Sequence, residues 1–246
     1  MLYKMNAQIM EAMRPVHVMA RQARQMAYQP WNPLNSSWAF RTFRASMELT
    51  ERLTEYYAQP AWELDTTEVN GRTVDVSYDH VMSKPYCDLL HFRRRTRALK
   101  QPKVLIVAPL SGHFATLLRG TVKEFMRDHE VYITEWKNAR DVPMGDGVFR
   151  FDDYIEYLID FMGWLGPDTH VLAVCQPCVP ALAAAAYMSK HANPNLPRSM
   201  TLMGGPVDTR ISPTEVNDYA SGKDLVWFEE NVIMRVPKGF KGRGQL

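Results

Sequence analysis

The chain has 246 residues, of which 46% are hydrophobic and 23% are charged. This is the composition of an ordinary globular protein, and it excludes a disordered, collagen-like or coiled-coil chain. The net charge of +2 is too small for a typical nucleic-acid-binding protein, which carries a concentrated basic face. The length allows one large domain, or one domain with an extension.

The three cysteines, Cys87, Cys175 and Cys178, are too few for a disulfide framework. Their odd number is typical of a protein in a reducing compartment. The N-terminus lacks the unbroken apolar core of a signal peptide, and no stretch approaches the roughly 18 apolar residues of a membrane span. We therefore expect a cytoplasmic protein that is not an integral membrane protein.

Residues 1–60 are predicted to form a helical N-terminal extension. Apolar residues recur at helical spacing over 2–20, and Pro15 is expected to break or kink that helix. The segment 29–33 interrupts the pattern, and a second helical run covers 39–57. These helices either pack on the main domain or form a surface that docks an apolar body.

Residues 61–100 alternate in polarity as strands do. Asn70-Gly71 lies between two alternating segments and predicts a tight β-hairpin. The basic run His91–Arg97 is expected to be an edge strand or a solvated face rather than a binding site.

From residue 103 onward, strand and helix patterns alternate with short links. This alternation predicts an α/β fold in which a mostly parallel sheet carries helices on both faces. Such sheets place their chemistry at the carboxyl ends of the strands. The predicted strands are Lys103–Ala108, Val131–Trp136, Val171–Val174 and Met200–Met203. The predicted helices are Ala115–Asp128, Phe151–Leu165 and Val179–Lys190.

Cys175 is the strongest candidate for a catalytic nucleophile. An apolar strand runs directly into it, and an alanine-rich helix follows at once. This order is that of a nucleophile elbow, a tight strand-to-helix turn that exposes one side chain at the edge of the sheet. The helix N-terminus favours the thiolate, and the backbone N–H of Gln176 is expected to bind an oxyanion.

The usual elbow reads Gly-x-Ser-x-Gly, whereas its glycine positions are Ala173 and Pro177 here. Support comes from the loop after the first parallel strand, where hydrolases of this layout place a second oxyanion donor. The backbone N–H of Leu110 or Ser111 is the candidate. His113, in the same loop, is expected to line the substrate pocket or to order the loop rather than to act as an acid–base catalyst.

Four segments stand out together: Pro109–His113, Thr134–Pro143, Val174–Pro180 and Thr201–Arg210. They resemble the intracellular polyhydroxyalkanoate (polyhydroxybutyrate) depolymerases, and the similarity extends over essentially the whole chain. The resemblance implies an α/β-hydrolase fold, a cysteine nucleophile at Cys175 and cytoplasmic action on stored polyester granules. Cys178 departs from the family, in which a small residue without a thiol is expected.

In α/β-hydrolases the acid and then the histidine follow the nucleophile in the chain. Here none of the seven histidines follows Asp208, and His191 ends the helix that starts at the elbow. We therefore expect residues 61–246 to be a C-terminally incomplete hydrolase core, part of a longer enzyme, with a cap region starting at about 207–246. Asp208 is either a stand-in acid beside the substrate pocket or a structural residue of its turn.

The predicted reaction is cleavage of the ester bonds of a poly(3-hydroxybutyrate)-type storage polyester through a cysteine acyl-enzyme. Water or coenzyme A is the expected acceptor, no metal or other cofactor is expected, and the expected partner is the polyester granule surface. Three alternatives stay open. One is a non-catalytic granule-binding fragment that lacks the triad base, and another is a related polyester synthase or thioesterase. The third is a redox protein that uses Cys175 and Cys178 as a Cys-x-x-Cys pair.

Overall fold

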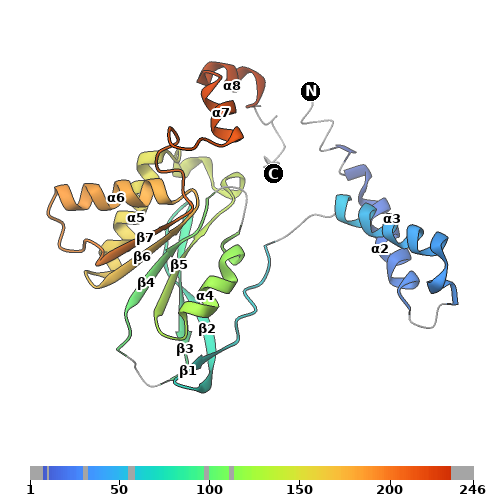
Figure 1. Ribbon diagram of the computed structural model, residues 1–246, viewed down its shortest axis with the longest axis horizontal. Coiled ribbons are helices and arrows are strands. Elements are labelled where there is room, and N and C mark those ends of the chain that lie inside the picture. Colours follow the sequence, from blue (N-terminus) through green and yellow to red (C-terminus); the bar gives the residue numbers. More distant parts are fainter. Residues whose placement is uncertain are drawn as a thin grey trace. The chain divides into compact units, whose positions relative to one another are not determined.

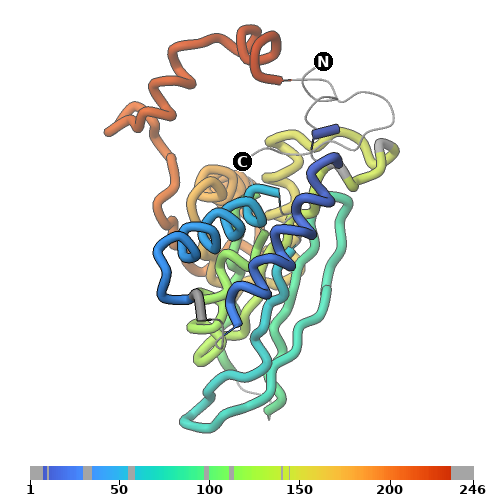
Figure 2. Tube along the Cα trace, turned by 90° about the vertical axis from the view of Figure 1, so that its right-hand side faces the viewer, coloured from blue at the N-terminus to red at the C-terminus, as the bar shows by residue number. Residues whose placement is uncertain are grey.

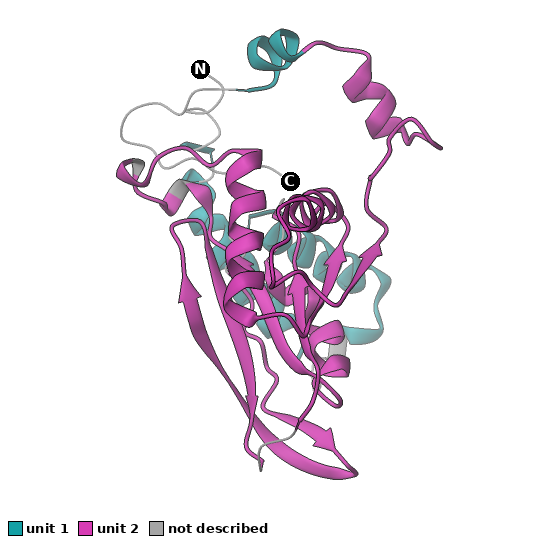
Figure 3. Cartoon of the chain, turned by 90° about the vertical axis from the view of Figure 1, so that its left-hand side faces the viewer, with its two compact units in different colours: residues 1–58, 225–240 teal, residues 59–224, 241–246 magenta. Residues whose placement is uncertain are grey.

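The computed structural model describes residues 8–9, 11–29, 33–54, 59–96, 100–110 and 114–233. The chain divides into two compact units, residues 1–58 with 225–240 and residues 59–224 with 241–246 (Figure 3). No helix in the described part of the chain combines the length and the apolar character needed to cross a membrane.

The described part of the first unit is helical, which confirms the prediction of a helical N-terminal region. It contains α2 (Arg14–Ala27), the 3-10 turn η1 (Pro33–Ser36), α3 (Trp38–Thr54) and α8 (Leu225–Asn231). Pro15 lies in the first turn of α2. A proline there removes no helical hydrogen bond, so the break expected at Pro15 is the beginning of α2.

An ion pair joins α2 to α3. Glu51 is 7% exposed, and its carboxylate accepts hydrogen bonds from the guanidinium group of Arg24. This pairing holds the pKa of the Glu51 carboxyl below its ordinary value. Nearby, His17 Nδ1 lies 3.1 Å from Thr54 Oγ1. Because a buried carboxylate needs a partner, these contacts fix one alignment of the two helices.

The second unit is built on a seven-stranded sheet (Figure 1). The antiparallel part consists of β1 (Thr66–Val69), β2 (Arg72–Ser83) and β3 (Cys87–Arg94), and β3 pairs antiparallel with β5 (Glu130–Trp136). The parallel part continues from β5 through β4 (Lys103–Val107) and β6 (Thr169–Val174) to β7 (Ser199–Met203). The spatial order is β1-β2-β3-β5-β4-β6-β7, so Cys175 follows a strand inside the parallel part.

Helices cover both faces of this sheet. On one face, α5 (Phe151–Leu165) and α6 (Cys178–Lys190) share a core with Leu105, Val107 and Ala173 of the strands. On the other face, the 3-10 turn η2 (Ala115–Leu118) and α4 (Arg119–Phe125) share a core with Ile106 and Leu172. Successive residues of a strand point to opposite faces, so the central strands contribute to both cores. The remaining described elements are η3 (Ala139–Asp141), η4 (Met144–Asp146) and α7 (Glu215–Ser221).

This architecture confirms the predicted α/β-hydrolase-like class. The strands expected from residue 103 onward begin and end within two residues of the observed ones. The helix expected over 115–128 is instead a 3-10 turn followed by α4, which ends at Phe125. The hairpin predicted at Asn70-Gly71 joins β1 to β2, and both residues have positive φ, +49° and +73°, as a two-residue type I′ turn requires.

Of the two expectations for the run His91–Arg97, the edge strand is wrong, whereas Arg93, Arg95 and Thr96 are exposed, as expected of a solvated face. Arg97 lies outside the described residues. The first residues of this run belong to β3, which lies inside the sheet between β2 and β5; the β2–β3 hairpin can be followed in Figure 2. His91 and Phe92 are buried, and burial lowers the pKa of His91. Arg93 forms an ion pair with Asp79 of β2. Asp79 on the neighbouring strand thus neutralises the charge of Arg93, whereas a charged side chain on an edge strand is stabilised mainly by water.

Candidate active site

Cys175 lies in the turn 175–177, which joins β6 directly to α6. Its backbone φ is +67°, in the left-handed region that is uncommon for residues other than glycine. Such strain costs roughly 1–3 kcal/mol and is concentrated at functional sites. The side chain is exposed. The turn therefore has the geometry of a nucleophile elbow.

Two backbone hydrogen bonds hold this turn. The Cys175 N–H donates to the carbonyl oxygen of Met203 at 2.7 Å, which extends the β6–β7 ladder by one bond. The Cys175 carbonyl oxygen accepts the N–H of Cys178, the first residue of α6, at 3.1 Å. Because one bond reaches β7 and the other reaches α6, the strained backbone of Cys175 is fixed from both sides.

A glycine outside the elbow, Gly205, allows the segment after β7 to approach Cys175 and Cys178 closely. Gly205 follows β7, and a Cβ atom at this position would lie 2.1 Å from Cys178 Cβ and 2.6 Å from the carbonyl oxygen of Cys175. The elbow's own glycine positions are occupied by Ala173 and Pro177. Gly205, shortly after β7, thus provides a glycine at the elbow, although the Gly-x-Ser-x-Gly positions themselves carry none. The sequence shows Gly204-Gly205 at a strand end, but it gives no sign of this contact.

The two backbone groups predicted to bind an oxyanion lie on adjoining segments. Among the described residues, the Gln176 N–H has no hydrogen-bond acceptor. The Leu110 N–H donates to the side-chain Oε1 of Gln176 at 3.0 Å, which joins the loop after β4 to the elbow. Ser111, the alternative donor, and His113 lie outside the residues that the structure describes.

Side chains of β5 position the start of the Leu110 loop. Ala108, the residue after β4, donates its N–H to Thr134 Oγ1 at 2.9 Å, and its carbonyl oxygen accepts the Trp136 Nε1–H at 2.9 Å. Both side chains are buried, and the Trp136 ring packs edge-on against Tyr154 with centroids 4.4 Å apart. These bonds tie Ala108 to β5 beyond the last pair of the β4–β5 ladder, Ile106 and Ile133, and so fix the position from which the loop departs.

Replacing Trp136 by phenylalanine keeps an aromatic ring but removes the donor to Ala108. We expect a loss of about 1–3 kcal/mol of unfolding free energy, because a buried carbonyl loses its partner, together with slower acylation of Cys175. Thr134→Val, which removes the acceptor of the Ala108 N–H, has the same expected effect. Urea unfolding and the acylation rate with an activated ester measure both quantities.

The control for these variants is Trp164→Phe, because Trp164 is 49% exposed. It should change the unfolding free energy by less than about 0.5 kcal/mol, as most surface substitutions do. An equal loss of stability and acylation in all three variants would show that Trp136 and Thr134 have no special role in positioning the loop.

The other two thiols are buried. Cys178 Sγ donates to the carbonyl oxygen of Ala173 at 3.3 Å, and burial raises the pKa of this thiol. Burial also raises the pKa of Cys87 well above its ordinary value. All three cysteines are free, so no disulfide closes the Cys-x-x-Cys segment. Cys175 is the thiol that a substrate can reach.

None of the described histidines is hydrogen-bonded to Cys175. His170 lies near the start of β6, at the opposite end of the strand from Cys175, and its Nδ1 is 2.7 Å from Ser199 Oγ. His191 follows the last residue of α6, as expected from the length of that helix. No group of three His, Cys, Asp or Glu side chains within the described ranges could hold a metal ion.

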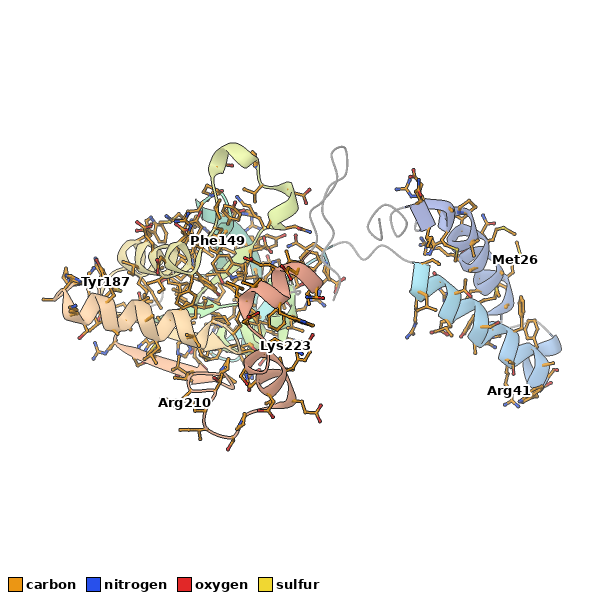
Figure 4. The ribbon with its side chains drawn as sticks, turned by 90° about the horizontal axis from the view of Figure 1, so that it is seen from above. Met26, Arg41, Phe149, Tyr187, Arg210 and Lys223 are labelled. Atoms are coloured by element: carbon orange, nitrogen blue, oxygen red, sulfur yellow. The ribbon has the colours of Figure 1, made fainter. Side chains whose placement is uncertain are left out.

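Asp208 is engaged in its own turn. Its carboxylate accepts hydrogen bonds from the backbone N–H of Arg210 at 3.1 Å and from the guanidinium group of Arg210 at 2.8 Å; Arg210 is labelled in Figure 4. These bonds hold the pKa of the Asp208 carboxyl below its ordinary value. Of the two roles predicted for Asp208, the structural one accounts for these contacts.

The family model described as "PHB de-polymerase C-terminus" matches residues 204–246, a segment that begins directly after β7. No curated protein matches the sequence.

Several solved structures resemble the chain at low sequence identity. Naproxen esterase (carboxylesterase NP) from Bacillus subtilis is 11% identical with a TM-score of 0.39, and the match covers 61% of this chain and 48% of that one. An α/β hydrolase from the metagenome of Lake Arreo, Spain, is 15% identical with a TM-score of 0.41, over 92% of this chain and 70% of that one. An esterase/lipase from an uncultured bacterium is 12% identical with a TM-score of 0.40, over 86% and 66%. The chain spans about half the length of the first of these, 48%, and its fold class rests on its own sheet order and elbow.

Proposed function

We propose that this protein cleaves the ester bonds of a poly(3-hydroxybutyrate)-type polyester. The match of residues 204–246 to the polyhydroxybutyrate depolymerase family model supports this substrate class. Cys175 is the nucleophile, and the backbone N–H groups of Gln176 and Leu110 bind the oxyanion. The observation that carries the proposal is the exposed Cys175 thiol with φ +67° on a strand-to-helix turn.

The reaction begins when the Cys175 thiolate attacks the carbonyl carbon of an ester. A carbon–sulfur bond forms, and the carbonyl π electrons move to the oxygen, which becomes an oxyanion stabilised by the N–H groups. Collapse of the oxyanion breaks the ester carbon–oxygen bond, and the released polymer hydroxyl takes up a proton. The acyl group is left as a thioester on Cys175.

A second acceptor then releases the acyl group. Water attacks the thioester to give a carboxylic acid, or the thiol of coenzyme A attacks it to give a coenzyme A thioester. Either reaction regenerates the Cys175 thiol. Every step is a polar acyl transfer, so the reaction requires neither a metal ion nor a redox cofactor.

Trapping the acyl-enzyme tests this proposal. The protein is mixed with p-nitrophenyl 3-hydroxybutyrate, quenched in acid and mapped by peptide mass spectrometry. We expect a 3-hydroxybutyryl group on the peptide that contains Cys175, and we expect hydroxylamine to remove it as it removes thioesters. Label on Cys87 or Cys178, or no label, would contradict the proposal. Analysis of the product formed with coenzyme A present then separates hydrolysis from thiolysis.

A second proposed role, suggested by exposed apolar side chains in the first unit, is binding to polyester granules in the cytoplasm. Met19 and Met26 of α2 are 69% and 73% exposed, and Trp38 and Leu53 of α3 are 74% and 71% exposed; Met26 is labelled in Figure 4. Clusters of exposed apolar side chains mark surfaces that bind other bodies, and a polyester granule presents an apolar surface.

Glutamate at Met19, Met26 and Leu53 together should reduce co-sedimentation with purified poly(3-hydroxybutyrate) granules. Burial of one such side chain contributes about 1.5–3 kcal/mol, so losing even one anchor predicts a fall of roughly tenfold or more. The matched control is glutamate at Val148 and Ile211 of the second unit, which are 74% and 72% exposed. Equal loss in both sets, or no loss in the first, would remove the proposed role of α2 and α3.

A further inference from the structure

The side chain of Gln176 occupies one of the two donors of the candidate oxyanion site. Its Oε1 accepts the Leu110 N–H at 3.0 Å, while its own backbone N–H has no acceptor in the described part of the chain. A carbonyl oxygen therefore already lies on the Leu110 donor, where the proposed reaction requires the oxygen of the attacked ester to bind.

We infer that the Gln176 carboxamide acts as a plug: its oxygen occupies the Leu110 N–H in the free protein and is displaced only by a charged oxygen. This inference rests on the proposed function, since it assumes that Cys175 attacks a carbonyl and that Leu110 helps to bind the resulting oxyanion. It gives the Gln176 side chain a role separate from that of the Gln176 backbone.

The resting state explains why such a plug exists. Leu110 is half-buried, and a backbone N–H that loses water without gaining a partner is costly. The side-chain carbonyl of Gln176 accepts this N–H, so no backbone carbonyl of the loop is needed as its partner. The bond is between neutral groups, so its net contribution is modest and it can be exchanged.

The competition between acceptors makes the plug selective. An amide oxygen is a better hydrogen-bond acceptor than an ester carbonyl oxygen, so an unreacted ester does not displace Gln176. An oxyanion forms charge-assisted hydrogen bonds that are about twice as strong as neutral ones, so it does displace Gln176. The Leu110 donor is thereby reserved for the transition state, where added binding accelerates the reaction.

A trifluoromethyl ketone tests this inference without requiring turnover. The Cys175 thiol loses its proton to the solvent, and the thiolate adds reversibly to the carbonyl carbon of propyl trifluoromethyl ketone: a carbon–sulfur bond forms and the carbonyl π electron pair moves to oxygen. The fluorines lower the pKa of the resulting hydroxyl, so hydrogen-bond donors at the site favour its ionised form. Fluorine NMR of the adduct measures the dissociation constant for the full chain and its variants. Iodoacetamide provides the parallel measurement, because it alkylates the same thiol by displacement of iodide and creates no oxyanion.

Removing the plug should strengthen ketone binding. Gln176→Ala and Gln176→Met both lack the side-chain carbonyl, and Met also keeps the length of the side chain, so each should bind the ketone roughly threefold to tenfold more tightly. Gln176→Glu places a carboxylate on the same donor and should bind it more weakly than the wild type. The iodoacetamide rate at Cys175 should stay within about twofold in the Ala and Met variants, since the thiol itself is unchanged.

The outcomes separate this inference from the proposed function. Weaker or unchanged ketone binding in both Ala and Met variants would overturn the plug, and would indicate that Gln176 only tethers the loop. A parallel change in the iodoacetamide rate would also overturn it, because the effect would then lie in the thiol. Ketone binding that persists in Cys175→Ala would instead overturn Cys175 as the nucleophile.

Discussion

Alanine in place of Cys175 is expected to abolish the acceleration of p-nitrophenol release from p-nitrophenyl 3-hydroxybutyrate, a fall of the order of 10³-fold or more for a protein whose catalysis depends on a covalent intermediate. The physical reason is that no other exposed thiol is available, because Cys87 and Cys178 are buried and burial raises the pKa of both thiols. The measurement is the initial rate with excess protein, compared with buffer alone.

Cys178→Ala is the matched control, since it removes the neighbouring thiol at the first residue of α6. The buried sulfur of Cys178 donates weakly to the backbone carbonyl oxygens of Ala173 and Met203, so its loss should leave the rate within about threefold, the equivalent of a small packing change. Equal loss in both variants would contradict a single nucleophile and would favour a two-cysteine redox pair. An unchanged rate in Cys175→Ala would remove the elbow from the mechanism.

Alanine in place of Gly205 is expected to destabilise the second unit by about 3 kcal/mol or more, the upper range for overpacking a rigid site. The new methyl group would lie 2.1 Å from Cys178 Cβ and 2.6 Å from a backbone oxygen of Cys175. Neither atom is at the end of a flexible side chain, so the elbow itself must move. We therefore expect the acylation rate of Cys175 to fall in the fraction that stays folded. Urea unfolding and single-turnover acylation measure the two effects.

The control is Gly120→Ala in α4, where an added Cβ meets no atom within 4 Å. A helical glycine-to-alanine change of this kind should stabilise the protein by about 0.5–1 kcal/mol. Adding Cys178→Gly to Gly205→Ala removes the contacts with Cys178 but not the one with the Cys175 carbonyl, so it should restore part of the stability. Additive effects of the two substitutions would show that the methyl group added at residue 205 does not press on Cys178.

The elbow can be predicted from the sequence because its signals are local. An apolar strand, one cysteine and an alanine-rich helix follow one another within residues 169–187, and that order alone specifies a strand-to-helix turn. The hairpin at Asn70-Gly71 is predictable for the same reason, since the turn residues themselves adopt the positive φ angles.

The contacts that support the elbow cannot be predicted in this way, because they join segments that are distant in the chain. Leu110 and Gln176 are 66 residues apart, and Ala108 and Thr134 are 26 apart. Gly205 has an ordinary strand-end sequence, and its role depends on the packing of β7 against β6. The place of the basic run inside the sheet cannot be predicted for a related reason, because Asp79, the partner of Arg93, lies on a neighbouring strand.

The bond from Cys175 to Met203 and the space left by Gly205 have a consequence for biosynthesis. Met203 and Gly205 both follow α6 in the chain. When the ribosome has released only the elbow and α6, Cys175 therefore still lacks the strand that fixes its backbone. The backbone of Cys175 gains these supports only after β7 has emerged and docked beside β6. For the proposed nucleophile, we therefore expect arrested chains that end before residue 203 to react with the ketone no better than a free cysteine does.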